Sequence, residues 1–300
     1  MHIHALSGDA EFLRMLASSS FSGKVHSIFE RTINLKCDQK DELYTVACDQ
    51  LDNGPNTLVL DVKRFHATGL EVGDRVLSEG QTLRIGNKME ITATQAKEWE
   101  CTLPPYPSNI ETLKVDIAFM KEYIAAHGKC GGMKSNSRPS TPFEAEMSNM
   151  LLQRSGLLRE ALAAGKSEEA VQYALGLVGL GPGLTPSGDD FLVGLFSIVN
   201  MPGAPYYLSC HFLEEIATKA KQLTNEISYM MVKKAVCGQV RDSVVNLLLA
   251  LSKGTANELL GALEKVLAIG SSSGTDMALG LVCGLELNIE AGGRACLLKS

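Results

Sequence analysis

Short stretches rich in β-branched residues alternate with turn residues over roughly residues 22–100. Turn-forming residues separate these stretches, as in Asp52-Asn53-Gly54-Pro55. Many short strands joined by close turns are typical of a small barrel or sandwich. The pattern predicts strands at 25–29, 43–48, 57–62, 75–77 and 89–93.

The pattern changes to helical spacing after the proline-rich segment 103–107. Apolar residues recur every three or four positions from Leu113 to Ile124, which predicts a helix over 110–126. Further helices are predicted at 143–164, 167–178, 189–200, 211–222, 224–236, 239–252, 256–268 and 276–287. The predicted fold class is therefore α+β. A β-rich domain (1–105), a small barrel or sandwich, is followed by a larger all-helical domain (106–300).

Residues 128–142 are rich in Gly, Ser, Pro and Lys, and we expect a mobile loop that ends at Pro142, a favourable first helical residue. The basic side chains of this loop are Lys129, Lys134 and Arg138. They are placed to close over an anion, although solvated surface charge is the more ordinary role for such residues.

Composition and charge exclude several classes of protein. Hydrophobic residues make up 45% of the 300 residues and charged residues 21%, which excludes wholesale disorder. The net charge of −6 predicts neither a nucleic-acid partner nor an anionic membrane surface. The longest apolar runs are too short for a membrane helix, and the first residues lack the pattern of a signal peptide, so we expect a cytoplasmic protein. Cysteine and histidine spacings give no zinc motif.

Two glycine-rich turns share one pattern at a separation of 86 positions. The first, residues 179–190, reads Gly-Leu-Gly-Pro-Gly-Leu-Thr-Pro-Ser-Gly-Asp-Asp, and the second, residues 270–276, reads Gly-Ser-Ser-Ser-Gly-Thr-Asp. Both continue as Ser-Gly-x-Asp-x-x-x-Gly-Leu, which aligns Asp190 with Asp276. Each turn opens a helix that is apolar around most of its circumference, so we expect both helices to be buried.

The simplest interpretation of each motif is a variant capping box. Ser187 or Ser273 would accept a bond from the first helical turn, and the aspartate three positions later would return one. A cap requires neither three alternating glycines nor a second acid, Asp189. Two buried helix N-termini that face each other instead form a pocket for an anion, or an acid-lined pocket for a cation. We therefore favour a functional site.

The charges around the two turns leave two mechanisms open. No Lys or Arg occurs in 167–218 or in 266–293. Either a divalent cation such as Mg²⁺ bridges the acids and an anionic substrate, or an aspartate acts as general base while amides and hydroxyls hold the anion. The sequence itself requires no cofactor, and we lean towards the second mechanism.

The candidate site follows from these motifs. The predicted catalytic residues, which are also the ligands in the metal alternative, are Asp189, Asp190 and Asp276. Thr224 is as readily a helix cap as a pocket residue. The residues predicted to bind an anionic substrate are Gly181, Gly183, Thr185, Ser187, Gly188, Ser272, Ser273, Gly274, Thr224 and Ser228.

The first turn, together with Ser273-Gly274-Thr275-Asp276 and Arg31-Thr32-Ile33-Asn34-Leu35, resembles the bacterial AllH family. This family includes the H subunit of oxamate carbamoyltransferase from anaerobic allantoin degradation, and the resemblance extends over nearly the whole chain. It implies a subunit of an enzyme that cleaves oxalurate with phosphate to oxamate and carbamoyl phosphate. It also implies an FdrA-like F subunit and a G subunit as partners, and a small anionic substrate. The resemblance assigns no residue roles.

Two other functions stay open. Gly274-Thr275-Asp276 resembles motifs of helical hydrolases of the ADP-ribosylglycohydrolase type, in which Gly-Asp pairs at helix N-termini bind two magnesium ions. Alternatively, the glycine turns only pack helices or dock partners in a non-catalytic assembly subunit.

Overall fold

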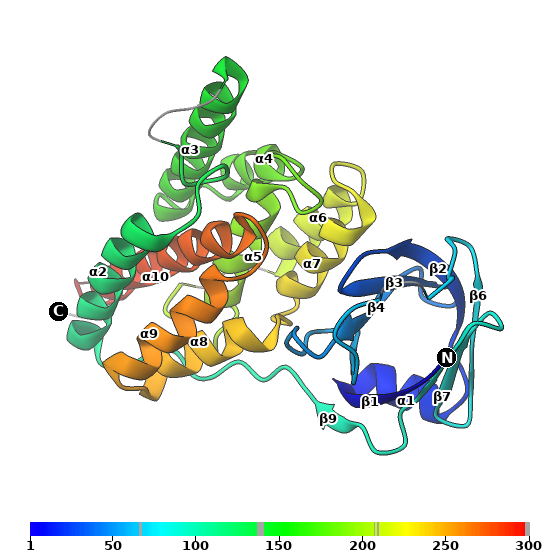
Figure 1. The fold of residues 1–300 in the computed structure, drawn as a ribbon. Coiled ribbons are helices and arrows are strands. Elements are labelled where there is room, and N and C mark those ends of the chain that lie inside the picture. Colours follow the sequence, from blue (N-terminus) through cyan, green and yellow to red (C-terminus); the bar gives the residue numbers. More distant parts are fainter. Residues whose placement is uncertain (66–67, 137–140, 207, 209, 298–300) are drawn as a thin grey trace. The chain divides into compact units, whose positions relative to one another are not determined.

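The computed structural model describes residues 1–65, 68–136, 141–206, 208 and 210–297 (Figure 1). The chain forms two compact units, Met1–Thr102 and Leu103–Ser300. The first unit is mainly β and the second is helical, so the predicted α+β class with an N-terminal barrel and a helical remainder is confirmed.

Eight strands of the first unit close into a barrel. They follow the order β5-β4-β3-β2-β6-β7-β8-β1, and an antiparallel pairing between β1 and β5 completes the ring. A ninth strand, β9, pairs in parallel with the end of β1. The strands are β1 (His2–Asp9), β2 (Ser22–Ile28), β3 (Thr32–Cys37), β4 (Leu43–Cys48), β5 (Thr57–Leu60), β6 (Arg75–Glu79), β7 (Thr82–Ile85), β8 (Met89–Thr92) and β9 (Lys97–Trp99).

Alternating side chains and one short helix fill the core of this unit. In β3, Ile33, Leu35 and Cys37 point into the core, as a period of two requires. Helix α1 (Ala10–Ala17) adds Phe12, whose ring contacts that of Tyr44. The other face of β3 carries the buried Asn34, which accepts a hydrogen bond from Thr45 on β4 and donates one to Ser27 on β2.

The hydrophobic pattern located five strands and missed four, as well as α1. Strand β1 was missed because Ile3 and Ala5 are its only fully buried apolar residues, so its alternation is weak. Strands β7 and β9 have four and three residues, too few for a periodic signal. Strand β3 alternates cleanly and was overlooked although its signal is present.

Each helix predicted for the second unit forms. The largest difference is at the last helix, which begins three residues earlier and runs ten residues further than predicted. No helix among the described residues combines the length and apolar character needed to cross a membrane. The helices are α2 (Ile110–His127), α3 (Pro142–Ala163), α4 (Ser167–Leu177), α5 (Ser187–Val199), α6 (Cys210–Ala220), α7 (Glu226–Val236), α8 (Asp242–Lys253), α9 (Ala256–Leu267) and α10 (Ser273–Leu297).

Helices α5 and α10 lie side by side in the middle of this unit (Figure 1). Every residue of α5 is buried, which agrees with its nearly continuous apolar sequence. Glycines allow the two backbones to touch: a Cβ on Gly194 would lie 2.1 Å from the carbonyl oxygen of Met277, and one on Gly280 would lie 2.0 Å from that of Phe191. The helix pair therefore has no room for any side chain at these two positions.

Replacing Gly280 with alanine should lower the free energy of unfolding by about 1–3 kcal/mol, because the added methyl group forces α5 and α10 apart. The matched control is Gly261→Ala in α9, where an added Cβ meets open space. That control should be neutral or stabilising by up to about 1 kcal/mol, since alanine is the better helix former. Urea unfolding followed by circular dichroism measures both. Equal stability of the two variants would contradict the close packing.

Candidate functional site

The two glycine-rich turns meet where α5 and α10 begin. The hydroxyl oxygens of Thr185 and Ser273 lie 2.9 Å apart, within hydrogen-bond distance. The glycine contacts between the helices are reciprocal, because Phe191 and Met277, like Gly194 and Gly280, are separated by the same 86 positions. The repeat seen in the sequence is therefore also a pair in space.

Neither serine of the repeated motif caps its helix. Ser187 and Ser273 are the first helical residues of α5 and α10, and the position before α5 is Pro186, which provides no side-chain cap. Among the described residues the Ser187 hydroxyl has no hydrogen-bond partner, and the Ser273 hydroxyl faces Thr185 of the other turn. The capping-box interpretation is therefore wrong for both motifs. The buried Ser187 hydroxyl instead lies close to the Asp276 carboxylate, without a hydrogen bond of normal geometry.

Asp190 is the least satisfied acid of the site. Its side chain is 1% exposed, and neither carboxylate oxygen has a hydrogen-bond partner among the described residues. Burial, together with the nearby charge of Asp276, raises its pKa to about 8. The hydroxyls of Ser273 and Thr185 lie close enough to oppose this shift, although neither completes a hydrogen bond of normal geometry. Asp190 is therefore a buried acid that holds its proton at neutral pH.

Asp276 lies beneath the loop that follows α2. The Met133 N–H donates to its Oδ1 at 2.7 Å, while Oδ2 has no partner among the described residues. A Cβ on Gly132 would lie 2.3 Å from Asp276 Oδ2 and 2.5 Å from Ser187 Oγ, so the bare backbone of Gly132 covers both groups. Burial raises the pKa of Asp276 to about 6, against the lowering effects of the Met133 bond and of the nearby Ser187 hydroxyl. Sequence reasoning did not select Gly132 and Met133, although the Gly131-Gly132 pair was a visible signal.

Asp189 differs from its neighbour because hydrogen bonds saturate its carboxylate. The Gly179 N–H donates to Oδ1 at 2.8 Å, and the hydroxyls of Thr224 and Ser228 donate to Oδ2 at 2.6 Å each. Burial raises its pKa, and these three bonds oppose the shift. Asp189 thus joins the first turn to the start of α7, and Thr224 and Ser228 face Asp189.

The predicted glycines play different roles. The N–H groups of Gly188 and Gly274 already donate to the carbonyls of Leu180 and Ile269, at 2.9 Å and 3.1 Å. Gly181, with φ of +120°, packs against the Ser187 backbone, whereas Gly183 is exposed at the outside of the turn. The remaining predicted residue, Ser272, is half-buried at the start of α10, and its hydroxyl lowers the pKa of Asp276.

The first part of the predicted mobile loop is tied to the helices. The Lys129 N–H donates to the Thr275 hydroxyl, and the Lys129 ammonium group binds the Ala268 and Gly270 carbonyls beyond the end of α9. The Lys134 ammonium group binds three carbonyls at the end of α2. Both lysines therefore neutralise helix C-termini, a role that the sequence analysis did not consider. Arg138 lies outside the described residues.

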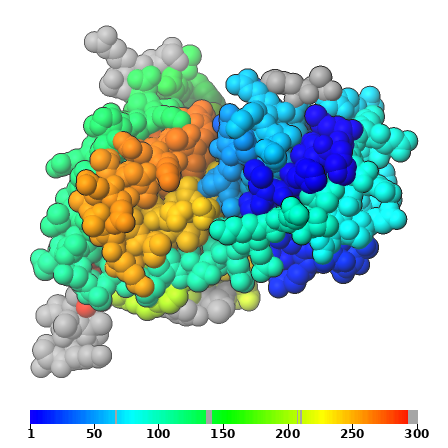
Figure 2. Space-filling model, turned by 60° about the horizontal axis from the view of Figure 1, so that its bottom comes forward, coloured from blue at the N-terminus to red at the C-terminus, as the bar shows by residue number. Residues whose placement is uncertain are grey.

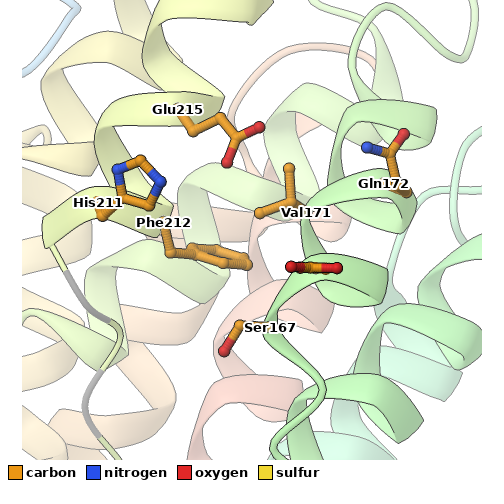
Figure 3. A pocket seen from close by; sticks show the side chains of 7 residues that line it. Ser167, Val171, Gln172, His211, Phe212 and Glu215 are labelled. Carbon is orange, nitrogen blue, oxygen red and sulfur yellow. The ribbon is translucent and has the colours of Figure 1, made fainter.

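The largest cavity described here lies away from the two turns. A cavity of about 530 Å³ opens between α4 and α6 (Figure 3), and none of the predicted site residues lines it. In the described part of the chain, no three His, Cys, Asp or Glu side chains are arranged to hold a metal ion. The cavity is lined by Ser167, Glu168, Val171, Gln172, His211, Phe212 and Glu215.

Two family models match the chain. Residues 4–98 match the AllH family N-terminal domain, and residues 177–285 match the oxamate carbamoyltransferase subunit AllH. The second match includes both glycine-rich turns. No solved structure matches the chain significantly.

Replacing Asp190 with asparagine should stabilise the chain progressively as the pH rises from 5 to 8. The folded wild type holds the Asp190 proton up to about pH 8, whereas the unfolded carboxyl loses it near its ordinary pKa of 3.8. The folded state thus binds one extra proton in this range, and its stability falls by about 1.4 kcal/mol per pH unit. The variant lacks this proton linkage. Urea unfolding at several pH values measures the difference.

Glu122→Gln is the matched control, because Glu122 is an exposed acid on α2 of the same unit. Its difference from the wild type should stay nearly constant over the same pH range. A constant difference for Asp190→Asn as well would show that Asp190 is not a buried, protonated acid.

Proposed function

The chain belongs to the AllH family of oxamate carbamoyltransferase subunits, and we propose that its buried Ser187, Asp190 and Asp276 take part in carbamoyl transfer. The proposed reaction is the cleavage of oxalurate by phosphate to oxamate and carbamoyl phosphate, as part of allantoin degradation in the cytoplasm. The proposed partners are an FdrA-like F subunit and a G subunit. The observation that supports the site is the buried Asp190 carboxyl, whose two oxygens have no partner among the described residues.

The reaction needs one proton acceptor and one proton donor. A phosphate oxygen attacks the carbamoyl carbon of oxalurate, and the bond between that carbon and the oxamate nitrogen breaks. The attacking phosphate gives up a proton, and the departing nitrogen takes one, so the proton count balances within the site. Two acids whose pKa values are separated by their environments suit this exchange.

Asp190 and Asp276 are assigned these two roles. Asp190, with a pKa of about 8, is the donor to the departing nitrogen, and Asp276, with a pKa of about 6, is the acceptor from phosphate. The hydroxyls of Thr185, Ser187 and Ser273 would donate to the anionic tetrahedral intermediate. Asp189 is a positioning residue here, because its carboxylate is already saturated by Gly179, Thr224 and Ser228.

The first turn and the start of α10 would still hold the anion, through a smaller set of amides than the sequence suggests. The N–H groups of Ser273 and Thr275 have no acceptor among the described residues. Those of Gly188 and Gly274 are engaged by carbonyls. The anion therefore belongs at the start of α10, between these amides and the Thr185 hydroxyl.

A magnesium-dependent reaction is the second candidate, and one observation favours it. The oxygens without partners among the described residues, on Asp190, Asp276 and Ser187, are of the hard type that Mg²⁺ prefers. One or two carboxylates together with a substrate phosphate are a usual magnesium environment. The chain in this case would act as a cation-assisted enzyme, with the helical hydrolases as a chemical analogue.

Asp190→Asn in the reconstituted complex should lower kcat for carbamoyl phosphate formation at least tenfold, about 1.4 kcal/mol in activation free energy. Asparagine keeps the shape of the side chain and cannot supply the proton. A coupled assay on the complex of this chain with the F and G subunits measures the rate. Glu122→Gln serves again as the control. An unchanged rate in a normally assembled Asp190→Asn complex would overturn the catalytic assignment and favour an assembly role.

The pH–rate profile should also be bell-shaped, because turnover requires Asp276 to be ionised and Asp190 to be protonated. As the pH rises, kcat/KM should increase near pH 6 and decrease near pH 8, with the two limbs belonging to the coupled pair. Asp276→Asn should abolish the rising limb and most of the activity. The same assay with EDTA separates the two candidates: a rate unchanged by EDTA supports proton transfer, and loss restored by Mg²⁺ supports the cation.

A further inference from the structure

The side chains of the proposed site are closed off from solvent. Ser187 and Asp276 are 0% exposed, and Asp190 is 1% exposed. The two cavities described along α4 and α6 are lined by other residues. An anion of the size of phosphate therefore reaches these groups only when part of the structure that covers them moves aside.

The helices and the first glycine-rich turn are fixed in place around these groups. Helices α5 and α10 pack backbone to backbone in the core of the unit, so their separation would break that core. The first turn is held by hydrogen bonds near both ends, because the Gly179 N–H donates to Asp189 and the Asn225 side chain donates to the Leu184 carbonyl. A movement that opens the site at little cost must involve another segment.

Residues 128–134, which follow α2, also cover the site, and we call them the covering loop. A Cβ on Gly132 would lie 2.3 Å from Asp276 Oδ2 and 2.5 Å from Ser187 Oγ, so the bare backbone of this glycine lies on both groups. The Met133 N–H donates to Asp276 Oδ1 at 2.7 Å. The removal of this loop would therefore expose one acid and the serine hydroxyl directly.

One exposed lysine ties the covering loop to the connection between α9 and α10. The Lys129 N–H donates to the Thr275 hydroxyl at 2.8 Å, and its ammonium group binds the Gly270 carbonyl at 2.7 Å and the Ala268 carbonyl at 3.3 Å. Helix α2 (green) lies beside α9 (orange) at the surface in Figure 2. Because the Lys129 side chain is exposed, water readily replaces the bonds of its ammonium group when the loop leaves.

The covering loop is folded on itself and on the end of α2. Gly131 has a φ of +103°, and its N–H donates to the Lys134 carbonyl at 3.1 Å. The Lys134 ammonium group binds the Ala125 and Gly128 carbonyls at 2.7 Å each. A Cβ on Gly131 would meet no atom within 4 Å, so this turn stands in open space. The loop is thus built to move as one piece about its attachment to α2.

We propose that the covering loop is a lid, which swings away from α10 to admit the anionic substrates and closes over Asp276 and Ser187 for the reaction, with Lys129 as its latch. This inference rests on the proposed function, because a reaction at these buried groups requires an entrance. Loops that close over a substrate exclude water from the reaction, and interactions between charges are stronger in a site without water.

The test measures how often position 187 becomes accessible. In the variant Ser187→Cys, a small methanethiosulfonate reagent modifies the new thiol only while the lid is open, and mass spectrometry of peptides separates this thiol from the native cysteines. Lys129→Met removes the latch and keeps an unbranched side chain. It should raise the modification rate about tenfold, the order expected for the loss of a hydrogen bond from a charged donor.

Two matched controls separate lid opening from general loosening. Ser197 lies further along α5, is 0% exposed and donates to the Val193 carbonyl at 2.7 Å. Lys129→Met should leave the modification rate of the thiol in Ser197→Cys unchanged, because that thiol becomes accessible only through wider unfolding. Lys114→Met removes a lysine of α2 that pairs with Glu111, and it should change neither rate.

Hydrogen exchange gives a second measurement that needs no cysteine variant. The peptide that contains residues 128–134 should exchange faster in Lys129→Met than in the wild type, whereas peptides of α5 should exchange equally in both. Unchanged rates at the lid in both assays, or equal acceleration at positions 187 and 197, would overturn the inference.

Failure of the lid differs from failure of the proposed function. Both assays use the purified chain without turnover, so they report lid opening whether or not Asp190 is catalytic. An inactive Asp190→Asn complex with unchanged labelling would keep the transfer reaction and remove the lid. An active Asp190→Asn complex with faster labelling would keep the moving loop and remove the catalytic assignment.

Discussion

The close contact between α5 and α10 is the constraint on which the rest of the helical unit depends. Two glycines remove the side chains from the contact, and each faces a carbonyl of the opposite helix. The helices therefore approach until their backbones touch, and their first turns arrive at one place. Glycine costs about 1 kcal/mol relative to alanine inside each helix, and apolar burial along both helices compensates for this loss.

This geometry explains why both oxygens of Asp190 and one oxygen of Asp276 are buried without a hydrogen-bond partner among the described residues. Asp190 and Asp276 stand three residues after the first residue of their helices, and that position is inside the unit because both helices are buried from the start. A purely structural pair of buried acids would normally be hydrogen-bonded, as Asp189 is. Unsatisfied acids in a rigid setting are typical of sites where a reaction supplies the missing partner.

The sequence predicted those features that are local or repeated. The helical spacing located each helix of the second unit, and the repeat at 86 positions singled out Asp190 and Asp276. It did not separate Asp189 from Asp190, because their different partners, Gly179, Thr224 and Ser228, are set by tertiary packing. The capping interpretation failed for a similar reason: a serine–aspartate spacing is the same whether the serine precedes the helix or belongs to it. The contact of Gly132 and Met133 with Asp276 spans more than 140 positions and leaves no periodic signal.

The donor that holds Asp276 is a main-chain group, and this has an evolutionary consequence. Because the peptide N–H of residue 133 makes the bond, its side chain contributes only apolar volume to the interior. Leucine or isoleucine would preserve the bond as well as methionine, whereas proline would abolish it. Position 132 tolerates only glycine, because any larger side chain would occupy the space of Asp276 and Ser187. Among homologues, position 133 should therefore vary among apolar residues, whereas position 132 should remain glycine.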